Sequence, residues 1–110
     1  MALQVILAQA GPLPITKTFA APGDEPMYLE VNGSVWSQNP NILIGIVVSL
    51  DGQVIGEAQV FSNGNATHRP VVPAYIQVQL SEGNHTLTLS ADTNGTVSDY
   101  NDLYNAVLHY

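Results

Sequence analysis

The sequence predicts an all-β fold, specifically an antiparallel jelly-roll sandwich of about eight short strands. Three observations support this prediction. Apolar and polar residues alternate with a period of two in several segments, as in strands that bury one face. Gly, Pro, Asn and Asp cluster between these segments at short intervals, which is typical of sandwiches and barrels. A helical period is absent apart from a possible short turn near Tyr100 to Tyr104.

The chain is expected to form one jelly-roll domain, residues 1–110, because its length suits a single core without internal staples. An immunoglobulin-like or fibronectin-like sandwich with Trp36 in its core is the alternative architecture. The expected strands, in chain order, are 3–8, 14–20, 27–36, 42–50, 53–61, 71–80, 85–91 and 103–110.

The first ten residues are expected to contribute an edge strand. They resemble a signal peptide with an Ala-Gln-Ala cleavage site, but they lack a positively charged leader and Gln4 interrupts their apolar run. The compartment in which the protein works is left open, since the chain also has no cysteine.

The strand expected at 42–50 is apolar on both faces. An antiparallel sheet in a small monomer normally leaves one face in water, so this strand needs a dry partner on each side. We therefore expect other copies of the chain to cover its second face, and the final strand to contribute to the same contact. That second face consists of Leu43, Gly45 and Val47.

The later strands alternate more clearly, and turn residues separate them. Asp51-Gly52 and Asn94-Gly95 have the chemistry of type I′ hairpin turns, which need positive φ at both positions. The side chains expected to face inward are Val54, Ala58 and Val60, then Ile76, Val78 and Leu80, then Leu87 and Leu89. The last strand carries Tyr104, Ala106, Leu108 and Tyr110 on one face and Leu103, Asn105, Val107 and His109 on the other.

The charge balance excludes one class of partner. Lys17 and Arg69 are the only basic residues against nine acidic ones, giving a net charge of −7. Two cations cannot neutralise the phosphates of nucleic acid, so nucleic-acid binding is excluded. Anionic membrane surfaces are disfavoured for the same reason. No run approaches the roughly 20 apolar residues that a membrane span needs, so membrane insertion is not expected.

Several short motifs follow one another from about Met27 onward. They are the strand at 25–31, the apolar strand 42–50 with its Asp-Gly turn, Ala66-Thr67-His68-Arg69-Pro70, the turn at 81–84, and the closing segment 98–107. This order resembles bacterial lectins with a tumour-necrosis-factor-like jelly roll, of the fucose-binding trimeric type. The resemblance implies a homotrimer with sugar sites at subunit boundaries, and places Thr67 and Arg69 in the site.

The loop at 62–69 is the richest polar segment and contains the only arginine. Sugars are bound by planar donors and acceptors, which arginine, amide and carboxylate groups supply, while an aromatic ring packs on the pyranose. The alternative is a solvated loop in which Arg69 forms an ion pair, within the chain or across a subunit boundary. The expected ligand-binding residues are Thr67, Arg69, His68, Asn63, Asn65, Asp99, Tyr75 and Tyr104.

Other chemistry is less favoured. Asp92, Asp99 and Asp102 could hold calcium, but Asp and Asn in such loops more often bond their own backbone. Catalysis is not expected, because no nucleophile-elbow motif and no evident pair of strand-borne carboxylates is present. No cofactor is expected either. The four Asn-x-Ser/Thr sequons are consistent with the Asn-rich composition alone.

The sequence therefore predicts non-catalytic carbohydrate binding by a homotrimer. The alternative is a structural trimerising or capping module without a small-molecule ligand.

Overall fold

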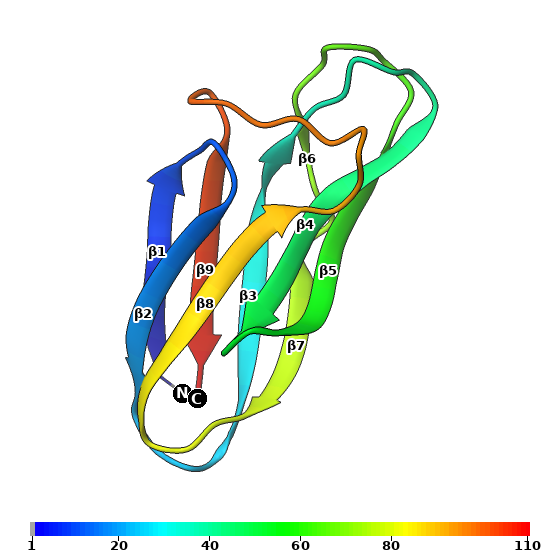
Figure 1. The fold of residues 1–110 in the computed structure, drawn as a ribbon. Coiled ribbons are helices and arrows are strands. Elements are labelled where there is room, and N and C mark those ends of the chain that lie inside the picture. Colours follow the sequence, from blue (N-terminus) through cyan, green and yellow to red (C-terminus); the bar gives the residue numbers. More distant parts are fainter. Residues whose placement is uncertain (1) are drawn as a thin grey trace.

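Two antiparallel sheets pack face to face in a computed structural model, which describes residues 2–110 (Figure 1). The predicted all-β jelly-roll sandwich is confirmed. The strands of this described region are β1 (Leu3–Ala10), β2 (Ile15–Ala21), β3 (Pro26–Val35), β4 (Ile42–Leu50), β5 (Gln53–Ser62), β6 (Arg69–Pro70), β7 (Ala74–Gln79), β8 (Gly83–Ala91) and β9 (Leu103–His109). Residues 2–110 contain no helix that could cross a bilayer.

One sheet has the order β1-β9-β3, with β6 and β7 pairing along the remaining edge of β3. The other has the order β2-β8-β4-β5. The segment around residues 3–8 is an edge strand, as predicted, since β1 pairs only with β9.

The strand predicted at 71–80 is shorter than expected: β7 covers Ala74–Gln79, and Arg69–Pro70 form the separate short strand β6 before it. Pro70 and Pro73 have no N–H to donate to a ladder, so β6 ends at Pro70 and β7 starts at Ala74. Between them, Val71 N donates to Gly33 O and Val72 N donates to Gln59 O, both at 2.9 Å. This short link therefore ties the edge of one sheet to the edge of the other.

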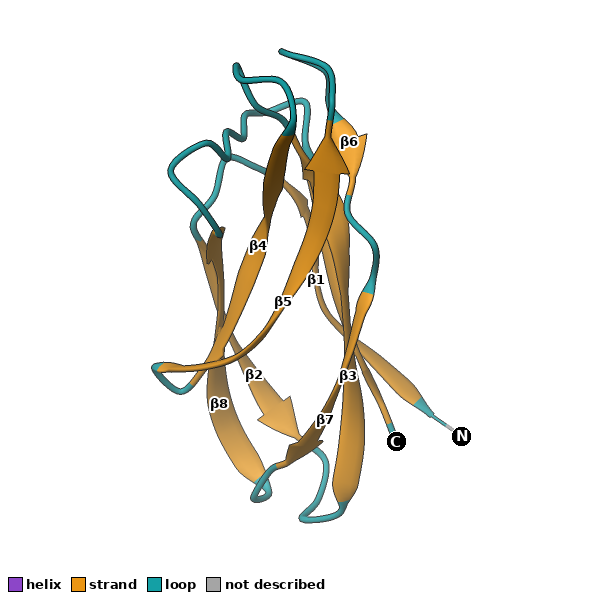
Figure 2. Ribbon diagram, turned by 90° about the vertical axis from the view of Figure 1, so that its right-hand side faces the viewer, coloured by secondary structure: helices purple, strands orange, loops and turns teal. Residues whose placement is uncertain are grey.

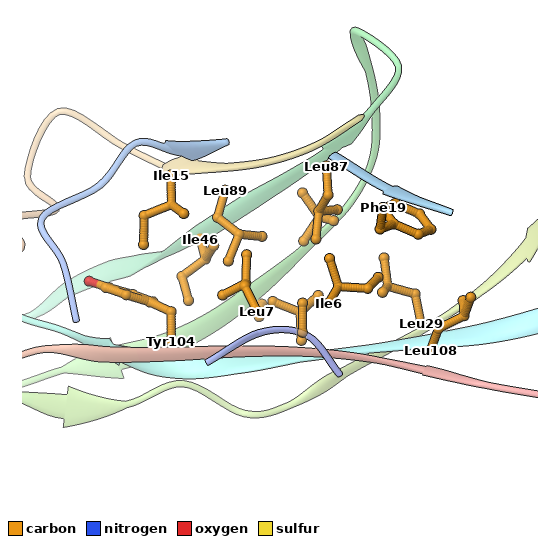
Figure 3. Packing of buried hydrophobic residues seen from close by; sticks show 14 of the residues in the cluster. Ile6, Leu7, Ile15, Phe19, Leu29, Ile46, Leu87, Leu89, Tyr104 and Leu108 are labelled. Carbon is orange, nitrogen blue, oxygen red and sulfur yellow. The ribbon is translucent and has the colours of Figure 1, made fainter. Parts of the chain in front are cut away.

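The core lies between the sheets and is filled by side chains at alternate strand positions (Figure 3). From the four-stranded sheet, Ile46, Leu87 and Leu89 are fully buried, and from the other sheet Leu29 and Leu108 are too. Each such side chain contributes about 1.5–3 kcal/mol relative to its exposed state.

The inward set predicted for β5 is wrong at Val54, which is 70% exposed. The β4–β5 register shifts between Val48 and Ser49, leaving Ile55 as an extra residue on β5. A bulge of one residue moves the side chains beyond it to the opposite face, so Ile55 rather than Val54 packs against the core.

The second face of β4 is partly covered from within the chain. Gly45 is buried, and the side chain of Gln59 on β5 lies against it. Leu43 remains 45% exposed. Val47 is half-buried. A sister chain is therefore not needed at Gly45, and the apolar surface that this face still presents comes mainly from Leu43.

One of the two predicted I′ turns forms. Asp51 and Gly52 have φ of 51° and 84°, as that turn requires. Asn94 and Gly95 are not among the described residues with positive φ, so that prediction is wrong. The strands flanking the second turn belong to different sheets, so no hairpin joins them.

Tyr104 fills the core beside two glycines, its ring extending along the interior in Figure 3. A Cβ at Gly33 would overlap the Tyr104 ring and lie 2.8 Å from Leu103 O. A Cβ at Gly11 would lie 2.7 Å from Asp99 O and 3.0 Å from the same ring. The absence of side chains at these two positions makes room for the tyrosine.

Gly33→Ala should lower the free energy of unfolding by about 1–3 kcal/mol, because overpacking forces the ring or the strand to move. Gly23→Ala is the matched control, since a Cβ there meets nothing within 4 Å. Chemical denaturation of both variants measures the difference. Equal stability of the two would contradict the packing described for Tyr104.

Candidate functional site

Three loops meet at one end of the sandwich: those joining β3 to β4, β5 to β6, and β8 to β9 (Figure 1). Trp36 and Val97 exchange backbone hydrogen bonds of 3.0 and 2.7 Å, and Ala66 N donates to Ser37 O at 2.5 Å. These bonds fix the loops relative to one another. We call the polar cluster here the loop-end site; it consists of Asn63, His68, Arg69, Asp99 and Asp102.

Asp102 is fully buried, and its carboxylate organises this site. Its Oδ1 accepts hydrogen bonds from Ser34 Oγ at 2.6 Å and from His68 Nδ1 at 2.7 Å. Its Oδ2 accepts one from the Asp99 backbone N–H at 2.9 Å. A buried carboxylate without partners would cost several kcal/mol, and these three donors keep the charge satisfied inside the fold.

His68 presents its second nitrogen toward another carboxylate. Its Nε2 lies 3.9 Å from Asp99 Oδ2, and both side chains are more than a third exposed. The hydrogen bond to Asp102 raises the pKa of His68 above its ordinary value, and the charges of Asp102 and Asp99 add to this rise. The ring also lies beside Trp36, with centroids 5.7 Å apart. His68 is thus a fixed donor at the surface.

Arg69 is positioned by β6, where it pairs with Val35 of β3. Its Nη2 donates to Asn63 Oδ1 at 2.9 Å, so the guanidinium binds an amide of its own loop. Its Nε is buried and has no hydrogen-bond partner within residues 2–110. Arg69 therefore retains donor capacity in this structure.

The other loop residues predicted for the site are exposed. Thr67 Oγ donates to Asn65 O at 3.4 Å, a long bond that a ligand hydroxyl could replace. Together with Asn63, these side chains border the loop-end site on its solvent side.

Neither of the two predicted tyrosines is placed to pack on a ligand at the loop-end site. Tyr75 is exposed on β7 opposite Glu30, five residues along β3 from the Val35–Arg69 pair and thus about 17 Å away. Tyr104 is fully buried, because alternation on β9 turns it inward with Ala106 and Leu108. Its burial corrects the expectation that it packs on a sugar. The exposed aromatic ring nearest in sequence to Asp99 is Tyr100.

The three aspartates considered as an alternative calcium site, Asp92, Asp99 and Asp102, are not brought together. Asp99 and Asp102 do converge, but with His68, and one ligand atom from each of the three lies within 4.8 Å of the others. Asp92 instead accepts a hydrogen bond from Gln59. Its proximity also raises the pKa of Glu57. A cation among the converging three would have to displace His68 from Asp102, so their arrangement is that of a hydrogen-bonded network.

The same geometry differs from a catalytic triad. A nucleophilic serine would bond the histidine nitrogen that faces away from the aspartate. Here Ser34 donates to the aspartate itself, and His68 Nε2 faces Asp99. The histidine is therefore not placed to activate a hydroxyl of Ser34.

No protein-family model and no curated protein sequence matches this chain. Solved structures with the same fold do match. A family 35 carbohydrate-binding module from Clostridium thermocellum is 13% identical with a TM-score of 0.56, over 96% of this chain and 90% of that one. The sugar-binding C-terminal domain of EclA is 12% identical with a TM-score of 0.52, over 97% and 79%. At such identities the likeness establishes the sandwich fold.

Sequence reasoning did not identify Ser34, nor Asp102 as the residue that orients His68. Residue 34 is 68 positions from residue 102 in the chain, and no local pattern marks the pair. Loop 62–69 and Asp99, in contrast, were found because polar side chains concentrate there.

An NMR titration of the imidazole protons should place the pKa of His68 above the ordinary value near 6.5. A raised pKa means that the folded state binds the proton more tightly. The pair therefore adds stability below the ordinary value, and that stability is lost as the pH rises through the folded value.

Asp99→Asn should reduce the shift at His68 and leave His85 unchanged, whereas Asp51→Asn should lower the pKa of His85 alone. A His68 that titrates at its ordinary value in the unmodified protein would contradict the geometry of this site.

Proposed function

We propose that this chain is a non-catalytic carbohydrate-binding module and that the loop-end site holds the sugar. The observation behind the proposal is the convergence of planar, partly exposed donors and acceptors on a preformed frame. His68 and Arg69 donate and Asp99 accepts; the buried Asp102 fixes His68 and the Asp99 backbone, while β6 and Asn63 hold Arg69. Bidentate groups of this kind suit the vicinal hydroxyls of a sugar ring.

Preorganisation supports this assignment. The loops are joined by main-chain hydrogen bonds, and His68 is held both by Asp102 and by the Trp36 ring. A site that is ordered before the ligand arrives loses little conformational entropy on binding. Because the binding side chains of this site are partly exposed, we expect weak, reversible binding of a glycan.

The two fold relatives with sugar-binding descriptions add support of a different kind, because they use the same sandwich for that purpose. Since the fold alone does not determine function, the weight of the proposal rests on the loop-end residues.

Glycan-array screening followed by calorimetry on a hit tests the proposal. Arg69→Ala and His68→Ala should each weaken binding by about tenfold or more, because hydrogen bonds involving charged groups contribute about 1.5–3 kcal/mol. Lys17→Ala is the matched control, because it removes the other basic side chain, which is exposed on β2.

Thermal unfolding confirms that each variant is folded. Silence of the folded protein on the array, or hits that neither loop-end substitution affects, would refute carbohydrate binding at this site.

We also propose self-association as a homotrimer, with the sugar near the subunit boundary as in the lectins that the sequence resembles. The outer side of the β1-β9-β3-β7 sheet supports an interface between copies. Its side chains are unusually apolar for a solvent face, and its charged pair is internal, with His109 Nε2 2.9 Å from Glu30 Oε1. Five of its apolar side chains are more than half exposed: Leu3, Val5, Tyr28, Tyr75 and Leu103.

This apolar sheet face also favours the second candidate function, a trimerising or capping module. A contiguous exposed apolar patch commonly marks a protein–protein contact. The two candidate functions differ in the role of Arg69, which binds a sugar in a carbohydrate-binding module and contacts another subunit in a trimerising module.

Light scattering coupled to size exclusion should give three times the mass of one chain. Val5→Asp should shift the population toward monomer, because the contact would bury an unpaired charge. Thr18→Asp, on the exposed polar face of β2, should leave the mass unchanged. A monomer at all micromolar concentrations would rule out the assembly.

A further inference from the structure

A cleft of about 540 Å³ lies between the sheets, away from the loop-end site. The β4–β5 hairpin, the end of β7 and the start of β8 bound it. The sheets are tied at Val71 and Val72, and from there β5 and β7 separate toward the β4–β5 turn (Figure 2). We call this feature the edge cleft. Its volume falls in the range of roughly 300–1,000 Å³ typical of small-molecule sites.

The edge cleft is at the opposite end of β4 from the loop-end site. β4 leaves the loop cluster at Ile42 and reaches the cleft at Leu50. Nine residues of strand separate the two places by about 30 Å. The proposed function makes no use of this cleft, so a ligand here would be independent of the first site.

The floor of the edge cleft is aliphatic. Val78 and Leu80 are buried, while Leu50 and Ile55 are half-buried and pack against the core. Such a surface accepts the C–H face of a ligand without leaving polar groups unpaired.

The rim is polar without excess charge. His85 Nδ1 lies 2.6 Å from Asp51 Oδ2, and His85 Nε2 lies 2.7 Å from Ser81 O. Both ring nitrogens therefore face acceptors, which favours a protonated imidazole whose charge the carboxylate offsets. The hydrogen bond to Asp51 also raises the pKa of His85. The His85–Asp51 pair therefore forms a rigid side of the edge cleft without net charge.

Two amides at the rim are free to bind. Gln53 and Gln77 line the cleft, and neither side chain hydrogen-bonds to another part of the described chain. The Gln79 amide, in contrast, donates to Asp24 O. Each free amide offers two N–H donors and one carbonyl acceptor, so it can bond a ligand hydroxyl that acts as an acceptor or as a donor.

An extended peptide fits the edge cleft less well. Peptide addition needs an uninterrupted strand edge. The bulge at Ile55 interrupts the edge of β5, and Pro73 directly precedes β7. The net charge of −7 disfavours polyanions, and no unpaired cation lines the cleft within residues 2–110.

We propose that the edge cleft is a second binding site whose ligand is a neutral saccharide. The aliphatic floor packs against the ring carbons, and Gln53 and Gln77 bond its hydroxyls. Two sites on one chain can engage a long glycan twice, which raises avidity without any further contact.

The test is a ¹⁵N NMR titration with cellohexaose, xylohexaose, maltohexaose and mannohexaose, each added to about 10 mM, which detects millimolar affinities. At least one probe should shift the amides of 50–55, 77–81 and 85 together. Gln53→Ala and Gln77→Ala should each weaken that binding about three- to tenfold. Gln9→Ala, an exposed amide on β1, is the matched control and should have no effect.

Shifts confined to 63–69 and 98–102 with every probe, or no shifts at all, would overturn the proposal. A response of the cleft that Gln53→Ala and Gln77→Ala leave unchanged would overturn it as well. Arg69→Ala separates the two sites, because it should weaken binding at the loop end about tenfold or more and leave the cleft response intact. The result for the edge cleft is therefore independent of the result for the proposed function at the loop end.

Discussion

The buried carboxylate of Asp102 is the constraint on which the loop end of this sandwich depends. It accepts hydrogen bonds from Ser34 on β3, from His68 in the loop before β6, and from the backbone of Asp99 before β9. The backbone carbonyl of Asp102 also accepts from Gly11 N at 2.8 Å, after β1. Segments from across the chain thus converge on one residue, and the three donors to its carboxylate are those that a buried ionised group requires. His68 and the Asp99 backbone take their positions from this requirement.

The sandwich divides its surfaces by chemistry. Its core needs only the alternate positions of each strand, so the opposite positions are free for other roles. On β2 and β8 they are largely hydroxyl-bearing, as where Thr16 meets Thr88 at 3.2 Å. On the five-stranded sheet several are exposed apolar side chains, with His109 and Glu30 forming an internal pair. Diverging edge strands at one end leave the edge cleft, and the loops at the other end carry the polar loop-end residues.

The small number of charges makes each pairing consequential. All three histidines contact a carboxylate: His68 with Asp102, His85 with Asp51, and His109 with Glu30. The His85 hydrogen bond lowers the pKa of Asp51, and the backbone N–H of Thr86 adds to this effect. The stability from that shift is present above the ordinary carboxyl value and is lost as the pH falls through the folded one. The pairs of His68 and His85 hold a loop and a turn in place, and the pair of His109 joins two neighbouring strands, β9 and β3.

The sequence by itself determined the all-β class, most strand positions and the Asp51-Gly52 turn, because alternation and turn chemistry are local properties. It also marked loop 62–69 as polar and rich in binding groups. Tertiary structure decided what depends on register and distant contacts. A one-residue bulge turned Val54 outward, and Pro73 delayed the start of the strand predicted at 71–80 until Ala74. Tyr104 entered the core beside Gly33, and His68 acquired a buried partner 34 residues away. These outcomes arise from packing between segments that are remote in sequence, so a local sequence pattern does not predict them.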